Sequence, residues 1–328
     1  MSGSERFPLA LTPTPLVEAA SLSRILGGPR ILIKRDDLTG RIVGGNKIRK
    51  LEYLLADARR AGATHVVTGG GAQSNHAAQT AVCARMAGLE AVLVLSRPAP
   101  GLPCGNLLVH RLLGITPEYV DRYEPDDLEE AMQDCCRRLE RAGNRPYHIP
   151  LGGSTVVGIR GYVDCWHEIA SQCLALGVSP AAIYSATGTG GTLAGLLLGH
   201  LDAPVPCRLV GVDVGAIPGD GPLPRAEALV AKARGGPCPT LPVELNRRQI
   251  GPGYARPGPD CLTAMRLFLQ TEGLLLDPAY TGKAAAALVV DIGAGRWQRD
   301  DTVVFIHTGG AAGFFTEGMA AQLDNSSA

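Results

Sequence analysis

Residues 44–52 read GGNKIRKLE, which combines a glycine turn with the start of an amphipathic helix. Apolar residues then recur at helical spacing and predict a helix with one packed face: Ile48, Leu51, Leu54, Leu55 and Ala58. Lys47 and Lys50 lie one turn apart on the same side of that helix. Burial beside a glycine turn can suppress the charge of a lysine and make it an amine nucleophile. Ordinary solvated lysines at a helix start are the alternative.

Short β-type runs alternate with helical runs on both sides of this stretch. The sequence predicts strands at residues 31–34, 64–68, 91–95, 116–120, 145–149, 182–186, 208–214 and 302–306. It predicts helices that include residues 75–87, 106–113, 128–142, 159–176, 192–200, 225–233 and 261–272, with another after residue 280. This alternation predicts an α/β fold of parallel sheets covered by helices on both faces.

The composition of the 328 residues restricts the class of protein. Lysine plus arginine and aspartate plus glutamate both count 31, so no net charge attracts nucleic acid or an anionic membrane. We see no signal-peptide pattern and no apolar run long enough to span a membrane. The nine cysteines form no C-x-x-C pair, so we expect neither a disulfide framework nor a metal site, and a cytoplasmic location.

A glycine-rich loop follows the strand predicted at residues 182–186 and precedes a helix. Its members are Thr187, Gly188, Thr189, Gly190, Gly191 and Thr192. Backbone N–H groups, hydroxyls and a helix N-terminus together are typical of a phosphate site. A dinucleotide site is one alternative, although Leu193 stands where its third glycine belongs. A plain loop at a helix start is the other.

Two further regions carry candidate functional side chains. Residues 69–76 read GGGAQSNH, so three glycines are followed by polar residues at a helix start. Ser74 or Asn75 is suited to cap that helix, and His76 is either an acid–base group or a satisfied interior histidine. Tyr254 and Tyr280 both lie beside turn residues, at loop positions where function concentrates.

Five motifs, in this order, resemble those of the D-cysteine desulfhydrase and 1-aminocyclopropane-1-carboxylate (ACC) deaminase family. They are residues 33–37 (IKRDD), 44–52, 73–76 (QSNH), 277–283 (DPAYTGK) and 307–310 (HTGG), and the resemblance spans about residues 11–315. It implies a fold-type-II enzyme that uses pyridoxal 5′-phosphate (PLP). It also implies a larger PLP-binding domain of residues 1–50 and 158–328, a smaller domain of residues 51–157, and a homodimer.

The resemblance assigns roles to particular residues. It implies four catalytic residues: Lys47, Ser74, Tyr254 and Tyr280. It implies cofactor contacts from Lys47, Lys50, Asn75, Thr281 and the loop from Thr187 to Thr192. It implies contacts with a small amino-acid substrate from Ser74, Asn75, His76, Thr155, Tyr254 and Tyr280. In this scheme Lys47 carries PLP and moves the substrate α-proton, Asn75 binds the 3′ oxygen, and Thr281 meets the pyridine nitrogen.

Two positions separate the branches of the family. Thr281 stands where the deaminases have a glutamate, and His76 stands where they have a glutamine. The resemblance therefore implies α,β-elimination of a small amino acid with a β leaving group, which gives pyruvate, ammonia and, from D-cysteine, sulfide.

Several alternatives are also compatible with the sequence. Arg256 follows Tyr254 in a loop that departs from the family pattern, which leaves room for an L-cysteate sulfo-lyase or for an arginine in solvent. ACC deamination, racemisation and β-replacement are related PLP reactions. A non-enzymatic protein that carries PLP is the remaining alternative.

Overall fold

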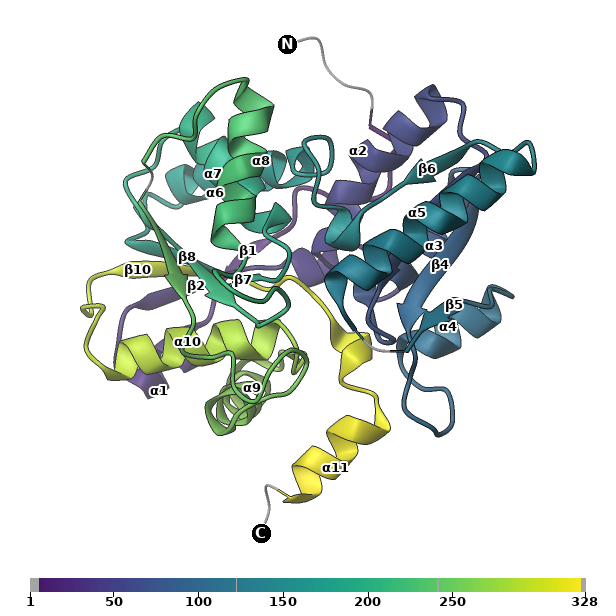
Figure 1. The fold of residues 1–328 in the computed structure, drawn as a ribbon. Coiled ribbons are helices and arrows are strands. Elements are labelled where there is room, and N and C mark those ends of the chain that lie inside the picture. Colours follow the sequence, from purple (N-terminus) through teal and green to yellow (C-terminus); the bar gives the residue numbers. More distant parts are fainter. Residues whose placement is uncertain (1–5, 122, 241, 326–328) are drawn as a thin grey trace.

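The computed structural model describes residues 6–121, 123–240 and 242–325, which form two sheets with helices on both faces (Figure 1). The strands are β1 (Leu16–Glu18), β2 (Arg30–Lys34), β3 (His65–Gly70), β4 (Glu90–Ser96), β5 (Glu118–Val120), β6 (Pro146–His148), β7 (Ala182–Thr187), β8 (Arg208–Asp213), β9 (Val243–Asn246) and β10 (Thr302–Ile306). The α-helices are α1 (Ala20–Leu26), α2 (Asn46–Arg60), α3 (Asn75–Met86), α4 (Asn106–Leu112), α5 (Pro125–Arg141), α6 (Arg160–Ala175), α7 (Gly191–Asp202), α8 (Leu223–Arg234), α9 (Pro259–Glu272), α10 (Thr281–Gly293) and α11 (Glu317–Asn325). Three short 3-10 helices cover Asp36–Leu38, Leu151–Gly153 and Ala311–Gly313.

The larger sheet has six strands in the order β1-β2-β10-β7-β8-β9. β1 is antiparallel to β2, and the remaining pairs are parallel. Side chains along β10 alternate between the two faces: Val303 and Phe305 pack with α1, α9 and α10, whereas Val304 and Ile306 pack with α6, α7 and α8. Burial of each such side chain stabilises the fold by about 1.5–3 kcal/mol.

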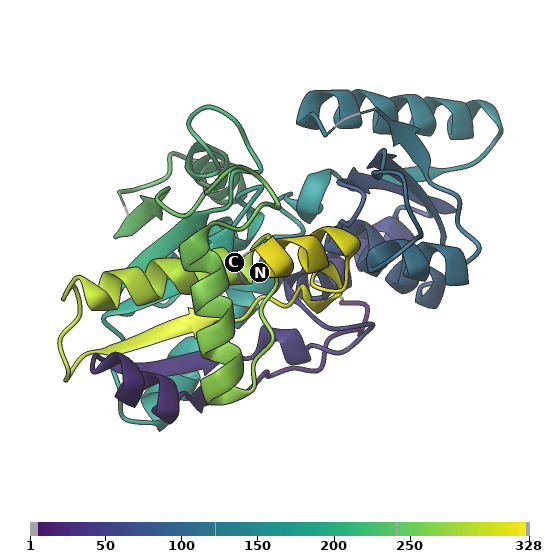
Figure 2. The same ribbon diagram turned by 90° about the horizontal axis from the view of Figure 1, so that it is seen from below.

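The smaller sheet has four parallel strands in the order β5-β4-β3-β6. One face packs on α2 and α3 through residues such as Leu51 and Ala77, and the other face packs on α5 through Leu128 and Met132. Figure 2 shows this sheet and its helices beside the larger one, with α11 lying between them in that view.

The structure confirms the predicted α/β fold with mostly parallel sheets. The short edge strands β1 and β9 were not predicted from the sequence, because three or four residues give no readable alternation. The helix predicted at residues 128–142 begins three residues earlier in the structure, as α5, because Pro125 takes the first helical position and Asp126 and Asp127 complement the helix N-terminus. The proposed boundaries of the smaller domain, residues 51–157, stay a prediction; its four strands lie inside them, while α2 begins at Asn46.

The topology brings several strand ends toward one place. β3 ends in Gly70, β7 ends in Thr187, and β10 leads into Thr308 and Gly309. Ligands in open α/β sheets bind outside the carboxyl ends of strands. No helix in the described part of the chain is both long and apolar enough to cross a membrane.

Candidate active site

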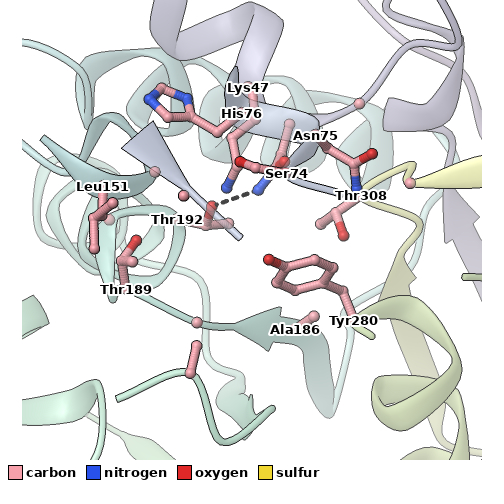
Figure 3. A pocket seen from close by; sticks show the side chains of 18 of the residues that line it. Lys47, Ser74, Asn75, His76, Leu151, Ala186, Thr189, Thr192, Tyr280 and Thr308 are labelled. Atoms are coloured by element: carbon pink, nitrogen blue, oxygen red, sulfur yellow. Dashed lines mark hydrogen bonds between the residues drawn. The ribbon is translucent and has the colours of Figure 1, made fainter. Parts of the chain in front are cut away.

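A pocket lies between the two sheets, at these carboxyl ends (Figure 3). It gathers most of the residues singled out in the sequence: Lys47, Lys50, Ser74, Asn75, His76, Thr187, Gly188, Thr189, Gly190, Gly191, Thr192, Tyr254 and Tyr280. In Figure 3, Lys47, Ser74 and His76 lie on one side of the space and Tyr280 lies on the other. Residues from segments as far apart in sequence as Gly44 and Gly310 therefore line one pocket.

Glycines fix the backbone in front of Lys47. Gly45 (φ 127°) forms an isolated antiparallel bridge with Gly309 (φ 82°), and the Asn46 amide donates to the Thr308 carbonyl oxygen at 3.0 Å. A Cβ on Gly309 would lie 2.6 Å from the Gly45 Cα, which is closer than real Cβ atoms approach. Only glycine therefore lets the two segments touch, and this contact places the first turn of α2 at the pocket.

Lys47 is buried enough to change its protonation. Burial lowers the pKa of Lys47 to about 8, while the charge of nearby Asp277 opposes that shift. At pH 7 roughly one molecule in ten then carries a neutral, nucleophilic amine, far more than for a free lysine. The structure thus supports a reactive lysine over a solvated one.

Lys50 faces the glycine-rich loop and lacks a counter-charge. It is 1% exposed, and its Nζ donates to the Gly152 carbonyl oxygen at 3.2 Å. No carboxylate among the described residues forms an ion pair with it. Burial and the charge of Lys47 hold the pKa of Lys50 well below 10.5. A Cβ on Gly191 would lie 2.8 Å from this Nζ, so the amine reaches the start of α7.

The loop at the start of α7 completes an anion site. Gly190 has φ 87° and opens the helix, whose N-terminal N–H groups carry partial positive charge. The Thr187 hydroxyl is buried without a hydrogen-bond partner, and the Thr189 hydroxyl lies 2.7 Å from that of Ser154. A buried lysine, a helix N-terminus and an unpaired hydroxyl together are suited to hold an anion such as phosphate.

The start of α3 supplies three polar side chains. Ser74 caps the helix, because its Oγ accepts from the Ala77 amide at 3.1 Å. Asn75 Oδ1 accepts from Asn106 Nδ2 at 2.8 Å, which fixes the orientation of the Asn75 amide. Both side chains line the pocket, so capping does not remove Ser74 from the site.

His76 is a neutral acceptor in this pocket. Burial and the charges of Lys47 and Lys50 hold its pKa well below 6.5. The Thr68 hydroxyl donates its hydrogen to the Ile149 carbonyl oxygen at 2.8 Å, so the His76 Nε2–H must donate to Thr68 at 3.0 Å. His76 Nδ1 then carries a lone pair, and it has no partner among the described residues.

Tyr254 and Tyr280 meet through their hydroxyls, which are hydrogen-bonded to each other. Their rings are T-shaped, with centroids 5.9 Å apart. Burial raises the pKa of both phenols above 10, so both are neutral proton donors at neutral pH.

Two residues that the sequence analysis did not assign hold these tyrosines in place. Asp277 Oδ2 accepts from the Tyr280 amide at 2.9 Å, at the start of α10. Lys283 Nζ donates to the carbonyl oxygens of Val214, Ile250 and Gly253 at 3.1, 2.7 and 2.7 Å, which ties down the segment before Tyr254. Both lie in the DPAYTGK motif. The sequence therefore showed the motif, but not which groups Asp277 and Lys283 contact.

Three residues discussed in the sequence analysis lie outside the pocket lining. The Thr281 hydroxyl accepts from the Asp277 amide at 2.8 Å and donates to Asp277 Oδ1 at 2.6 Å, so its hydrogen is already engaged. Thr155 Oγ1 accepts from the Gly158 amide at 3.0 Å. Arg256 is exposed. Their proposed contacts with cofactor or substrate have no direct support from this geometry.

The structure adds Tyr123 to the pocket, a residue for which the sequence gave no signal. Its ring lies 5.0 Å from that of Tyr254, and burial raises the pKa of its phenol above 10. It precedes α5 of the smaller sheet, so only folding brings it to Tyr254.

Comparison with known proteins gives a consistent result. A family model described as "Pyridoxal-phosphate dependent enzyme" matches residues 8–309. The chain is 41% identical to a D-cysteine desulfhydrase of Serratia proteamaculans over 94% of this chain and 95% of that protein. It is 40% identical to a D-cysteine desulfhydrase of Salmonella choleraesuis over 94% and 96% of the two chains.

Solved structures show the same relationship. A crystal structure of an ACC deaminase homologue is 37% identical and has a TM-score of 0.88, over 98% of this chain and 96% of that one. The processed form of threonine deaminase isoform 2 from Solanum lycopersicum is 18% identical with a TM-score of 0.64, over 95% and 82% of the two chains, and it shares the fold.

Proposed function

We propose a function from the premise that this chain belongs to the family of pyridoxal-phosphate dependent enzymes. It is an enzyme, and its cofactor is PLP. The function that the site supports best is α,β-elimination from a small amino acid with a β leaving group, as its D-cysteine desulfhydrase relatives suggest. From D-cysteine the products would be pyruvate, ammonia and sulfide.

The residues fit PLP at both of its ends, and this pairing carries the proposal. Lys47 offers an amine with a pKa of about 8 for the cofactor aldehyde. For its phosphate, the site offers the Lys50 amine without a carboxylate partner, the N-terminus of α7 and the Thr187 hydroxyl. We assign Asn75 to the 3′ oxygen and Thr281 to the ring nitrogen on the family resemblance, and the second assignment requires the Thr281 hydroxyl to offer its remaining lone pair or to leave Asp277.

The chain's own groups would then move protons at defined atoms. When bound, PLP withdraws electrons from the substrate α-carbon and so makes its proton removable. The neutral amine of Lys47 accepts that proton. Ser74 orients the substrate carboxylate from the start of α3. The Tyr254–Tyr280 pair, protonated at neutral pH, supplies a proton to the departing sulfur.

A substrate panel tests the proposal directly. Purified protein loaded with PLP would receive D-cysteine, L-cysteine, L-cysteate or β-chloroalanine, with pyruvate release as the readout. We expect kcat/KM for D-cysteine at least tenfold above that for L-cysteate. Absence of pyruvate from every member would contradict the proposal.

ACC deamination is the second candidate, because the solved ACC deaminase homologue matches nearly the whole chain. Thr281 and His76 disfavour it, since both replace residues typical of that branch. Incubation with ACC and assay for 2-oxobutanoate separates the two functions, and we expect no release above background.

Two properties from the sequence analysis remain proposals. A homodimer is supported by exposed leucines on α4, with Leu108 47% and Leu112 88% exposed, and sedimentation velocity would test it. A cytoplasmic location is supported by nine cysteines with free thiols, and cell fractionation would test it.

A further inference from the structure

A second, larger cavity opens on the outer side of the tyrosines. Its volume is about 490 Å³. Six residues line both this outer cavity and the pocket around Lys47: Gly71, Ser74, Asn75, Tyr123, Tyr254 and Tyr280. The two spaces therefore adjoin at the residues assigned to the substrate. A substituent that extends from the substrate β-carbon past the tyrosines would enter the outer cavity.

The walls of the outer cavity are mainly apolar. The loop between β4 and α4 contributes Pro98, Pro100 and Leu102, while Leu107 comes from α4 and Met319 from α11. Tyr123 adds an aromatic face on which a ring can pack. Such a lining with a few polar groups at one end is typical of pockets that bind small molecules.

One wall residue shows backbone strain at this place. Ala255 lines the outer cavity with φ 59°, a left-handed conformation that is unfavourable for a non-glycine residue. Residues in such conformations cluster at ligand sites.

The charges around the outer cavity select the kind of substituent. Its described lining contains no lysine, arginine or histidine. Asp277 is already saturated by hydrogen bonds, and Glu317 stands beside Gly101, where an added Cβ would lie 2.8 Å from its Oε2. A sulfonate would meet a carboxylate and find no cation there, whereas an uncharged group would meet no penalty.

The size of the outer cavity exceeds what cysteine needs. Pockets of roughly 300–1,000 Å³ bury ligands much larger than an amino acid. We propose that the outer cavity is a subsite for a bulky, uncharged, mainly apolar β-substituent, so that a cysteine with a large apolar group on its sulfur is accepted at least as well as one with a small group. This inference rests on the proposed elimination.

Elimination from an S-substituted cysteine has the same atom and electron balance as elimination from cysteine. The α-proton passes to Lys47, the Cβ–S bond breaks, and its electron pair leaves with sulfur, which takes a proton to become a thiol. Water converts the remaining three-carbon product to pyruvate and ammonia. No oxidant or reductant is required.

A graded series of substrates tests the subsite. Cysteine, S-methyl-, S-ethyl- and S-benzyl-cysteine of the preferred hand would be compared by pyruvate release and thiol formation. We expect kcat/KM for S-benzyl-cysteine to be at least equal to that for S-methyl-cysteine. A fall of 100-fold or more from methyl to benzyl, with cysteine still active, would overturn the inference. Failure of every substrate would instead contradict the proposed function.

Two leucines, one in the cavity lining and one exposed elsewhere, provide a matched pair of variants. Leu107→Trp narrows the outer cavity, and we expect kcat/KM for S-benzyl-cysteine to fall about tenfold with cysteine changed less than twofold. Leu269→Trp, on α9, exposed and outside the lining of both cavities, should change neither. An equal loss for all substrates in Leu107→Trp would overturn the subsite.

A second copy of the chain is the other group that could fill the outer cavity. Sedimentation velocity of these variants distinguishes it from a substrate substituent. If Leu107→Trp changes the oligomeric state and leaves the size preference unaltered, another subunit covers the outer cavity and the subsite is wrong. An unchanged oligomeric state with an altered size preference supports it. Tyr123→Ala adds a second check. It should lower kcat/KM for S-benzyl-cysteine about tenfold more than kcat/KM for S-ethyl-cysteine, because the aromatic face is lost.

Discussion

The side of the pocket that we propose for the cofactor and the side that we propose for the substrate are lined by different kinds of group; they are called the cofactor side and the substrate side. Backbone N–H groups, glycines and buried lysines make the cofactor side, where Lys50 has no ion-pair partner among the described residues. Loop tyrosines make the substrate side, and their hydroxyls satisfy each other. The cofactor side therefore carries positive charge that stays uncompensated until an anion binds. The tyrosine hydroxyls of the substrate side, in contrast, already hydrogen-bond to each other. Substitutions should act most strongly where charge is uncompensated.

The largest effect is expected at Lys47, where the cofactor side meets the chemistry. Lys47→Ala should lower pyruvate release from D-cysteine by roughly 1,000-fold or more, because it removes both the base and the site of attachment. The visible absorbance of bound cofactor should change with it. Lys232→Ala, at an exposed lysine on α8, is the matched control and should match the wild type. An unchanged spectrum in Lys47→Ala would refute the account.

Lys50 offers the sharpest test of uncompensated charge. Lys50→Met should raise the dissociation constant of PLP by roughly 100-fold, because charge-assisted hydrogen bonds to phosphate are lost. The same change should stabilise the cofactor-free protein by about 1–2 kcal/mol, since a buried charge without a partner is removed. Equilibrium dialysis and thermal unfolding measure the two effects. Loss of stability in both forms would show that Lys50 is already compensated.

The pH dependence of that stability follows from the same lysine. The pKa of Lys50 is lower in the folded chain than its ordinary 10.5, so unfolding takes up a proton between the two values. The cofactor-free wild type should therefore gain stability relative to Lys50→Met as the pH rises toward 10.5. A constant difference between pH 7 and 10 would contradict the burial of this charge.

On the substrate side, Tyr280 should matter only when the leaving group needs a proton. Tyr280→Phe should lower kcat for D-cysteine about 10- to 50-fold, because a proton donor to sulfur is lost. With β-chloroalanine the loss should be less than threefold, since chloride leaves without a proton. Steady-state kinetics with both substrates decides the point, and equal losses would assign Tyr280 a role in binding instead.

The rate of cofactor attachment should report the pKa of Lys47. Only the neutral amine reacts, and burial sets its pKa at about 8. The rate with cofactor-free protein should therefore rise about tenfold between pH 7 and pH 9 and level off above. Stopped-flow absorbance measures this, and a rise that continues to pH 10.5 would show an ordinary lysine.

The smallest effect is expected at Arg256, at the edge of the substrate side. Because Arg256 is exposed and outside both cavities, Arg256→Ala should change kcat/KM for D-cysteine and L-cysteate less than twofold. A selective tenfold loss with L-cysteate would restore the sulfonate interpretation.

Most of the cofactor side could be predicted from sequence because its parts are local. A glycine turn, a helix start and a strand–loop–helix crossing each lie within about ten residues, and their chemistry is fixed by that local geometry. The residues around Lys47, Ser74 and Thr187 were found in this way. The substrate side was found only in part, because Tyr123, Asp277 and Lys283 acquire their roles from contacts distant in sequence.

The sequence by itself determined the α/β fold and indicated Lys47 and the loop from Thr187 to Thr192 as candidate site residues, because periodicity, glycine positions and helix starts are short-range properties. Tertiary structure alone decided which charges are left without partners, which hydroxyls are already engaged, and where the outer cavity opens beside Tyr123. Burial and contact between distant segments set those properties. They determine protonation and free space, and neither can be read from the spacing of residues along the chain.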